Sequence, residues 1–157
     1  MDKHINHLSA KEQHLMIHAP LYVSVLIAEA DGDIKNKEKA RIVELVHIKS
    51  FSEHHGLNEL YKELDHDVAE ELRTLIASLP DDRYEREVAL VDLISGLNHI
   101  LPKCKYSFAS HYYKSLREFA HYIATFEGGF WGIGAITKAE AKFVKLPMIN
   151  EPQEHQN

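Results

Sequence analysis

The sequence has little cysteine and no long apolar run, and each shortage excludes a class of protein. Its single cysteine, Cys104, leaves no partner for an intrachain disulfide, so nothing calls for an oxidising compartment. The longest apolar stretch, residues 19–28, is about half of what a membrane-spanning helix needs. The first residues, Met-Asp-Lys-His-Ile-Asn-His, lack the apolar segment of a signal peptide. We therefore expect a cytoplasmic protein with no membrane span.

Positive charge is also in deficit. The chain carries 24 acidic and 18 basic residues, which gives a net charge of −6. Binding to a phosphate backbone needs a basic surface, so we do not expect a nucleic acid as the partner. The acidic balance suits a cation or a basic protein surface better. The 12 histidines should make solubility depend on pH, because free imidazole titrates around 6.5.

Helix start and stop signals, by contrast, are present along the whole chain. Ser9-Ala10-Lys11-Glu12 and Asp82-Arg83-Tyr84-Glu85 are capping boxes, which satisfy free backbone donors at a helix start. Between turn signals no stretch alternates with a period of two, so no sheet is expected. Apolar spacing and these signals predict seven helices, over about residues 9–31, 37–51, 57–64, 67–79, 82–101, 107–127 and from 137 onward.

The predicted fold is an all-α bundle in one domain over residues 1–146, followed by a short polar tail at 147–157 that we expect to be loose. Pro20 inside the first helix predicts a kink or a break near His18, because proline removes a helix hydrogen bond. The helix at 107–127 is strongly aromatic and is predicted to lie in the core. Any aromatic face left exposed on it would allow a homodimer.

The junction between the first two helices gathers carboxylates. Asp31, Gly32 and Asp33 end the first helix, and Glu38 lies in the first turn of the next. A left-handed Gly32 would bring the two aspartates together. Carboxylates in a loop suit Ca²⁺ or Mg²⁺, although this spacing is not that of an EF-hand. The alternative is that Asp33 and Glu38 only cap and favour the start of the following helix.

A weaker copy of this junction occurs near the C-terminus. Glu127-Gly128-Gly129 ends one predicted helix, and Glu140 begins the next. In both junctions an isoleucine precedes the second glutamate by four residues, as Ile34 precedes Glu38. The repetition predicts two related helical hairpins that face each other.

The stretch Ala-Asp-Gly-Asp-Ile-x-x-x-Glu at 30–38, with its degenerate copy, resembles the TerB-like family. That family is named for tellurite-resistance proteins and includes the N-terminal domain of the co-chaperone DjlA. The similarity covers the hairpins at 15–52 and 107–146. It implies an all-α fold, no enzymatic activity, a link to stress response and an acidic metal site. Carried over residue by residue, the metal ligands are Asp31, Asp33, Glu38, Glu127 and Glu140.

The chain departs from the family pattern at residues 128–134, Gly-Gly-Phe-Trp-Gly-Ile-Gly. Aromatic and glycine residues stand there in place of possible oxygen ligands. No Lys-Ser/Thr follows the glycines, so the segment is not a phosphate loop. Its Phe130 and Trp131 would either fill the domain's own core or form a binding hot spot for a partner.

Together these observations predict a non-enzymatic binding module that engages a protein partner and takes a divalent cation at the acidic junction, Ca²⁺ or Mg²⁺ in preference to Zn²⁺. The alternative is a metal-dependent enzyme or metal sensor that uses these carboxylates with histidines. Two pairs have a ligand-like helical spacing, His14 with His18 and Glu118 with His121.

Cys104 is the remaining candidate for chemistry. Its neighbours Lys103 and Lys105 would lower the pKa of its thiol, and His99 lies five residues upstream. No acidic or amide residue is recognisably placed to orient that histidine as a triad requires. We therefore assign no catalytic residue.

Overall fold

The computed structural model describes residues 3–30, 32–127 and 141–154. Over these ranges the chain forms six α-helices and no strand, which confirms the all-α prediction. Two short 3-10 helices, η1 (Gly96–His99) and η2 (Leu101–Lys103), follow the fifth helix. The α-helices are α1 (Ala10–Ala28), α2 (Asn36–Ser52), α3 (Leu57–Asp65), α4 (Val68–Ser78), α5 (Arg83–Ser95) and α6 (Tyr106–Glu127).

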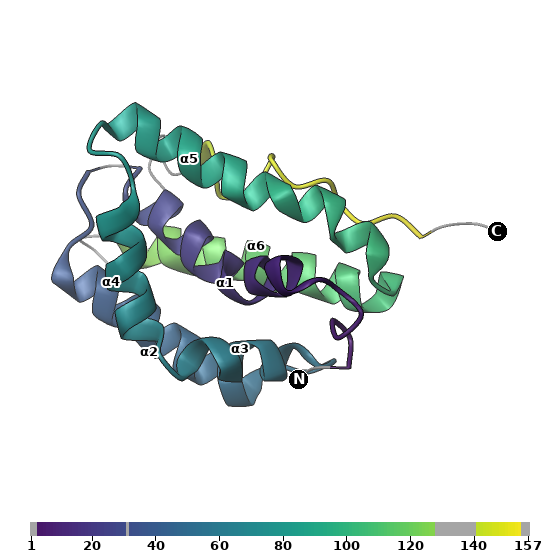
Figure 1. Cartoon of the computed structure of the whole chain (residues 1–157). Helices are drawn as coiled ribbons and strands as arrows, with labels where there is room; N and C mark the ends of the chain where they lie inside the picture. The colour runs from purple at the N-terminus through teal and green to yellow at the C-terminus, as the bar shows by residue number, and fades with distance from the viewer. Residues whose placement is uncertain (1–2, 31, 128–140, 155–157) are drawn as a thin grey trace.

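The bundle is built around α1 and α6, which pack against each other in its middle (Figure 1). On one side α5 covers α1, and on the other α2 and α3 pack together as a pair. The central position of α1 follows from its sequence. A helix that is apolar all round must be buried on all sides, and every residue from Val23 to Ala28 is buried.

Pro20 does not break α1, so of the predicted kink or break near His18 the break is absent. The helix runs without interruption from Ala10 to Ala28. Proline lacks the N–H that would bond to the carbonyl four residues earlier, that of Met16. The Tyr112 hydroxyl of α6 donates to this carbonyl oxygen instead, at 2.8 Å. A side chain from a neighbouring helix therefore replaces the missing backbone donor.

Both predicted capping signals act at helix starts. Ser9 and Glu12 form the full reciprocal capping box of α1. The Asp82 carboxylate accepts from the Glu85 backbone N–H at 3.0 Å and caps α5. These helix starts were predictable because each depends on residues only three apart.

The end of α5 was predicted less well. The helix stops at Ser95, and 3-10 turns fill the stretch that we expected to remain α-helical up to Leu101. Gly96 has low helix propensity. It also packs closely on α1, so a Cβ at this position would lie only 2.9 Å from the Leu15 side chain. Leu101 precedes Pro102, which disfavours the α conformation.

The predicted count of seven helices is not confirmed. The seventh was expected from Thr137, and residues 128–140 lie outside the described ranges, as does the second junction of the proposed repeat. Where the description resumes, Ala141 is helical and residues 142–145 form a turn.

We expected the C-terminal segment to be loose, but its described part is packed against the bundle. Leu146 and Ile149 are buried in the core, with exposed fractions of 0% and 4%. The Asn98 amide donates to the Met148 carbonyl oxygen at 2.9 Å and accepts from the Asn150 backbone N–H at 2.7 Å. The Asn98 side chain therefore holds the segment through two hydrogen bonds to its backbone. The segment, drawn in yellow, can be followed beside α5 (Figure 1).

None of the helices in the described ranges is both long enough and apolar enough to cross a membrane.

Candidate functional site

The acidic junction between α1 and α2 faces the start of α5. Asp33 is fully exposed, and its carboxylate lies 3.5 Å from the Arg83 guanidinium. Gly32 has a φ of 154°, which other residues rarely adopt, so a glycine is needed here. This conformation is not the helix-ending left-handed one that we predicted. Asp31 lies outside the described residues.

A second arginine of α5 joins the junction more firmly. Arg86 binds the Glu29 carboxylate through both ends of its guanidinium, at 2.6 and 3.0 Å. Its remaining Nη1 donates to the carbonyl oxygens of Ile76 and Pro80, at 3.3 and 3.1 Å. The hydrogen bonds with Glu29 raise the pKa of Arg86 despite partial burial. Arg86 thereby ties together the end of α1, the end of α4 and the start of α5.

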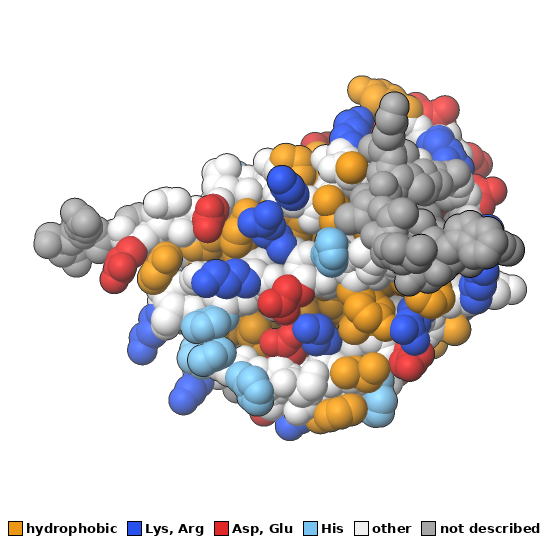
Figure 2. Space-filling model, turned by 180° about the vertical axis from the view of Figure 1, so that it is seen from behind, with side chains coloured by type: hydrophobic (Ala, Val, Ile, Leu, Met, Phe, Trp, Pro, Cys, Tyr) orange, Lys and Arg blue, Asp and Glu red, His pale blue; other side chains and the backbone are white. Residues whose placement is uncertain are grey.

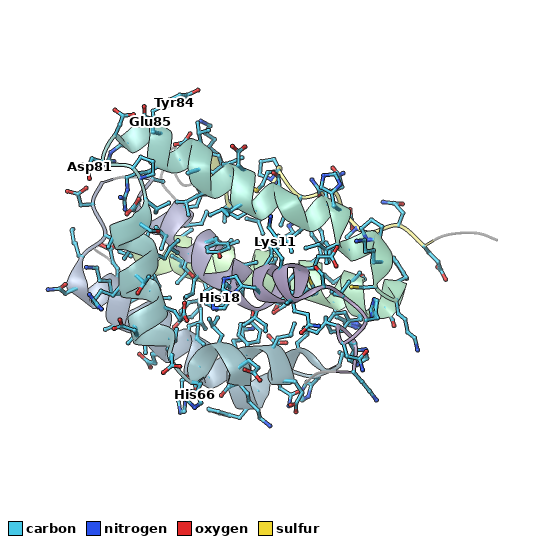
Figure 3. All side chains as sticks on the ribbon, in the orientation of Figure 1. Lys11, His18, His66, Asp81, Tyr84 and Glu85 are labelled. Carbon is cyan, nitrogen blue, oxygen red and sulfur yellow. The ribbon has the colours of Figure 1, made fainter. Side chains whose placement is uncertain are left out.

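A small cavity of about 110 Å³ lies between these groups. Figure 3 shows Asp81, one of its lining residues, on the turn that leads from α4 into α5. The charged residues that line it are four carboxylates and two arginines: Glu29, Asp33, Asp81, Glu87, Arg83 and Arg86. Arg83 and Arg86 already pair with Asp33 and Glu29. The positive charges of these arginines offset the negative charge of the two carboxylates, which weakens the attraction of the junction for a metal cation.

Glu38 behaves differently from Asp33. Its side chain is 5% exposed, and its Oε2 has no hydrogen-bond partner among the residues described. A buried carboxylate oxygen without a partner is unusual, because desolvation of a charged group is costly. Arg41, one turn further along α2, also has an Nε without a hydrogen-bond partner in the described part of the chain, while its guanidinium lies over the rings of Tyr122 and Phe126.

The alternative interpretation, that these carboxylates cap and favour the start of α2, fits the position of Glu38 but not that of Asp33. The N-cap position of α2 is Lys35, whose side chain makes no capping bond. Asp33 lies two residues before that position, and it pairs with Arg83 instead. Glu38 is in the first turn, where an acidic residue favours the helix dipole, but its burial goes beyond what that role requires.

The five predicted ligands are therefore only partly visible. Asp31 and Glu140 lie outside the described residues, and Glu127 is the last residue of α6, with a side chain that is not described. In the described ranges, no three or more histidine, cysteine, aspartate or glutamate side chains are arranged to hold a metal ion. The five-residue metal site remains a prediction.

The histidine pair of α1 is not arranged as ligands. The rings of His14 and His18 stack at 3.8 Å between centroids, and His18 Nδ1 lies 2.8 Å from the His14 carbonyl oxygen. The Nε2 atom of His18, a residue labelled in Figure 3, lies 3.5 Å from the Glu71 carboxylate of α4. Burial lowers the pKa of His14, and the neighbouring His18 lowers it further.

Cys104 is not an activated thiol. Partial burial raises its pKa to about 11, and Glu12 adds to this effect. The expectation that Lys103 and Lys105 would lower this pKa was therefore wrong. Lys103 is drawn instead to Glu12, with which it forms an ion pair. At neutral pH such a thiol is almost entirely protonated, so it is a poor nucleophile.

A groove that the sequence did not reveal runs along the outer face of α6. Its volume is about 650 Å³, and its lining residues are Lys114, Arg117, Glu118, His121, Tyr122, Thr125, Val144 and Lys145. Figure 2 views the molecule from this side and shows Lys and Arg side chains spread over it. We call these eight residues the α6 groove.

Charge in the α6 groove is opposite to that of the whole chain. It contains three permanent cations, Lys114, Arg117 and Lys145, and one carboxylate. That carboxylate, Glu118, is exposed and lies 3.7 Å from Lys49 of α2, which binds Glu53 more closely, at 2.5 Å, and so offsets the charge of Glu118 only in part. The spacing of Lys114, Arg117 and His121 along one helix face was visible in the sequence. It could not be distinguished there from an ordinary solvated surface.

No family model, curated protein or solved structure matches this chain.

Proposed function

We propose that this chain is a non-enzymatic binding module that engages an acidic segment of a protein partner through the α6 groove. The observation that carries the proposal is the local reversal of charge. On a chain with a net charge of −6, the groove gathers three cations around a single carboxylate. Complementary charge of this kind gives specificity and speeds association.

The groove also offers apolar contact. Tyr122 and Val144 are half-buried and supply its apolar surface. The Arg117 guanidinium lies 5.6 Å from the centre of the Tyr113 ring, which restrains the arginine. Tyrosine and arginine are the residue types that most often dominate the energy of protein interfaces. A partner segment with several carboxylates and one apolar side chain would fit this combination.

Binding can be measured by fluorescence anisotropy with a labelled Glu-rich peptide that contains one Phe. The test variant is Lys114→Glu/Arg117→Glu, and the matched control is Lys37→Glu/Lys62→Glu, which makes the same change in net charge on exposed residues of α2 and α3. We expect the test variant to weaken binding at least about tenfold, or about 1.4 kcal/mol, and the control to change it little. Equal weakening in both would show that only net charge matters, and would reject the groove as the site.

A second candidate function is supported by Glu38. A carboxylate that is 5% exposed and has an oxygen without a hydrogen-bond partner among the described residues is suited to a cation, and the resemblance to TerB-like proteins supports the same idea. We propose that Ca²⁺ or Mg²⁺ binds there in addition to the partner. Asp33 is not needed for this, because its charge is taken by Arg83.

Thermal unfolding of the chelated protein, with and without Ca²⁺ or Mg²⁺, tests the cation. Ligand at a hundred times its dissociation constant adds about 2.7 kcal/mol to the free energy of unfolding. This gain should disappear in Glu38→Gln and persist in Asp33→Asn. If neither ion raises the unfolding temperature of the unmodified chain, the proposed cation site is rejected. The proposal that the α6 groove binds a partner does not depend on this result.

We do not propose a metal-dependent enzyme. The rings of His14 and His18 stack on each other, and the thiol of Cys104 is protonated at neutral pH, so these residues are not set up as metal ligands or as a nucleophile.

A further inference from the structure

A second, more enclosed pocket lies at the opposite end of α6, where the C-terminal segment crosses the 3-10 turns. Its volume is about 220 Å³. Its walls come from η1 and η2, from the start of α6 and from the C-terminal segment. The lining residues are Asn98, Leu101, Pro102, Cys104, Tyr106, Ala109, Asn150, Glu151, Pro152 and Gln153. Carbon atoms make up most of this surface.

One wall of the pocket is held at a single place. The two hydrogen bonds of Asn98 fasten the segment at Met148 and Asn150. Beyond Asn150, residues 151–153 line the pocket and make no hydrogen bond to the rest of the described chain, since the hydrogen bond from Gln153 goes to the Glu151 carbonyl oxygen within the segment. These last residues therefore form a wall that is attached at one end.

We propose that this pocket binds a small, mainly apolar ring compound that is neutral or cationic, and that the Asn98 fastening controls access to it. The proposal is independent of the α6 groove.

Size favours a compound of one or two rings. An apolar cavity of about 150 Å³ is enough to hold benzene, and this pocket is somewhat larger. Leu101 and Ala109 are buried beneath it, with exposed fractions of 4% and 1%, so its floor belongs to the rigid core. A larger ligand would have to displace the attached wall.

Charge selects against anions. Glu151 is the only charged residue among those that line the pocket. The Cys104 thiol in the opposite wall is protonated at neutral pH, since burial raises its pKa to about 11, and it adds no charge. An anionic ligand would approach Glu151 with no cation in the lining to balance it. A neutral or cationic ring avoids this repulsion, and a cation gains attraction.

The single cysteine makes access to the pocket measurable. Because Cys104 lines it and is the only thiol in the chain, the rate of modification by iodoacetamide reports directly on whether the pocket is open. In Asn98→Ala the wall loses both of its bonds. We expect the modification rate to rise at least about fivefold while the unfolding temperature stays well above the assay temperature. A rise caused by global unfolding would be recognised by a matching loss of far-ultraviolet circular dichroism.

Three probes that share one ring system test the ligand class. Indole is neutral, tryptamine is cationic and indole-3-acetate is anionic at neutral pH. We expect indole and tryptamine to slow the modification of Cys104 in the unmodified chain, and indole-3-acetate to do so at least about tenfold less effectively. The difference should shrink in Glu151→Gln, which keeps the shape of the wall and removes its charge.

The proposal fails if none of the three probes slows the modification, or if all three act equally. It fails also if Asn98→Ala leaves the rate unchanged, because the wall then does not depend on that fastening. Binding of the Glu-rich peptide to the α6 groove is measured separately and should be unchanged in Asn98→Ala, so failure of one proposal does not imply failure of the other.

Discussion

The acidic junction and the α6 groove are both rich in charge, but they differ in how that charge is matched. At the junction, Glu29 and Asp33 are each paired with an arginine of α5. In the groove, Lys114 and Lys145 form no ion pair within the part of the chain that the structure describes. Charge that is matched internally stabilises the fold, whereas unmatched charge is available to a partner. The same residue types therefore support different conclusions in the two places.

The largest effect should come from Arg86. Replacing it by alanine leaves the Glu29 carboxylate, which is 14% exposed, without its partner. Removing one member of a buried pair commonly costs about 3–5 kcal/mol, and partial exposure places this case near the lower end. Urea unfolding should show this loss. A double variant, Glu29→Gln/Arg86→Met, should be clearly more stable than Arg86→Ala, and if it is not, the unpaired charge is not the cause.

Salt should weaken peptide binding at the α6 groove while leaving the stabilising contribution of Arg86 at the junction largely unchanged. Raising the ionic strength from about 0.1 M to about 1 M shortens the Debye length from about 10 Å to about 3 Å. Affinity of the Glu-rich peptide should then fall at least about tenfold, because the groove's lysines are exposed. The pair between Glu29 and Arg86 is largely shielded from solvent, so the contribution of Arg86 to unfolding free energy should persist. Affinity that does not respond to salt would show that the groove binds by apolar contact alone.

Arg83 should matter much less than Arg86. Its pair with Asp33 is exposed, and exposed pairs contribute about 0–1 kcal/mol. Arg83→Ala should therefore lower the free energy of unfolding by less than about 1 kcal/mol. The variant also frees the Asp33 carboxylate. If it creates a Ca²⁺-dependent rise in unfolding temperature that survives Glu38→Gln, then Arg83 is what keeps the junction from binding a cation.

The smallest effect should be that of His14 on the decline in stability at acidic pH. The pKa of His14 is lowered in the folded protein, first by burial and then by His18. The unfolded chain therefore binds this proton more readily, so the stability contribution is present above the ordinary value of about 6.5 and is lost as the pH falls below it. In His14→Gln the unfolding temperature should decline less between pH 7 and pH 5 than in the parent chain. An identical decline would assign the pH dependence to other groups.

Local signals in the sequence predicted the helix starts. The predictions failed where the structure depends on contacts between residues far apart in the chain. Ser9 and Asp82 act on backbone groups three residues away, so their capping roles could be read directly. The end of α5 depends on Gly96 packing against Leu15 and on Asn98 bonding to the C-terminal segment, and neither contact has a local pattern.

The candidate site was predictable only as a set of carboxylates. The sequence identified Asp33 and Glu38 but could not show that Arg83 pairs with the first and that the second is buried. Glu29 and Arg86 are separated by 57 residues, and no spacing rule connects them. The cations of the α6 groove were visible as residues, but the groove exists only because Val144 and Lys145 lie beside α6.

The bond between Tyr112 and Met16 has a consequence for the order in which the protein is assembled. The two residues are 96 positions apart, so the middle of α1 lacks one hydrogen bond until the last long helix docks on it. That bond also fixes the axial position of α6, since a slide by one turn, about 5.4 Å, would leave the carbonyl bare in the core. The proline thus makes completion of the first helix conditional on arrival of the sixth.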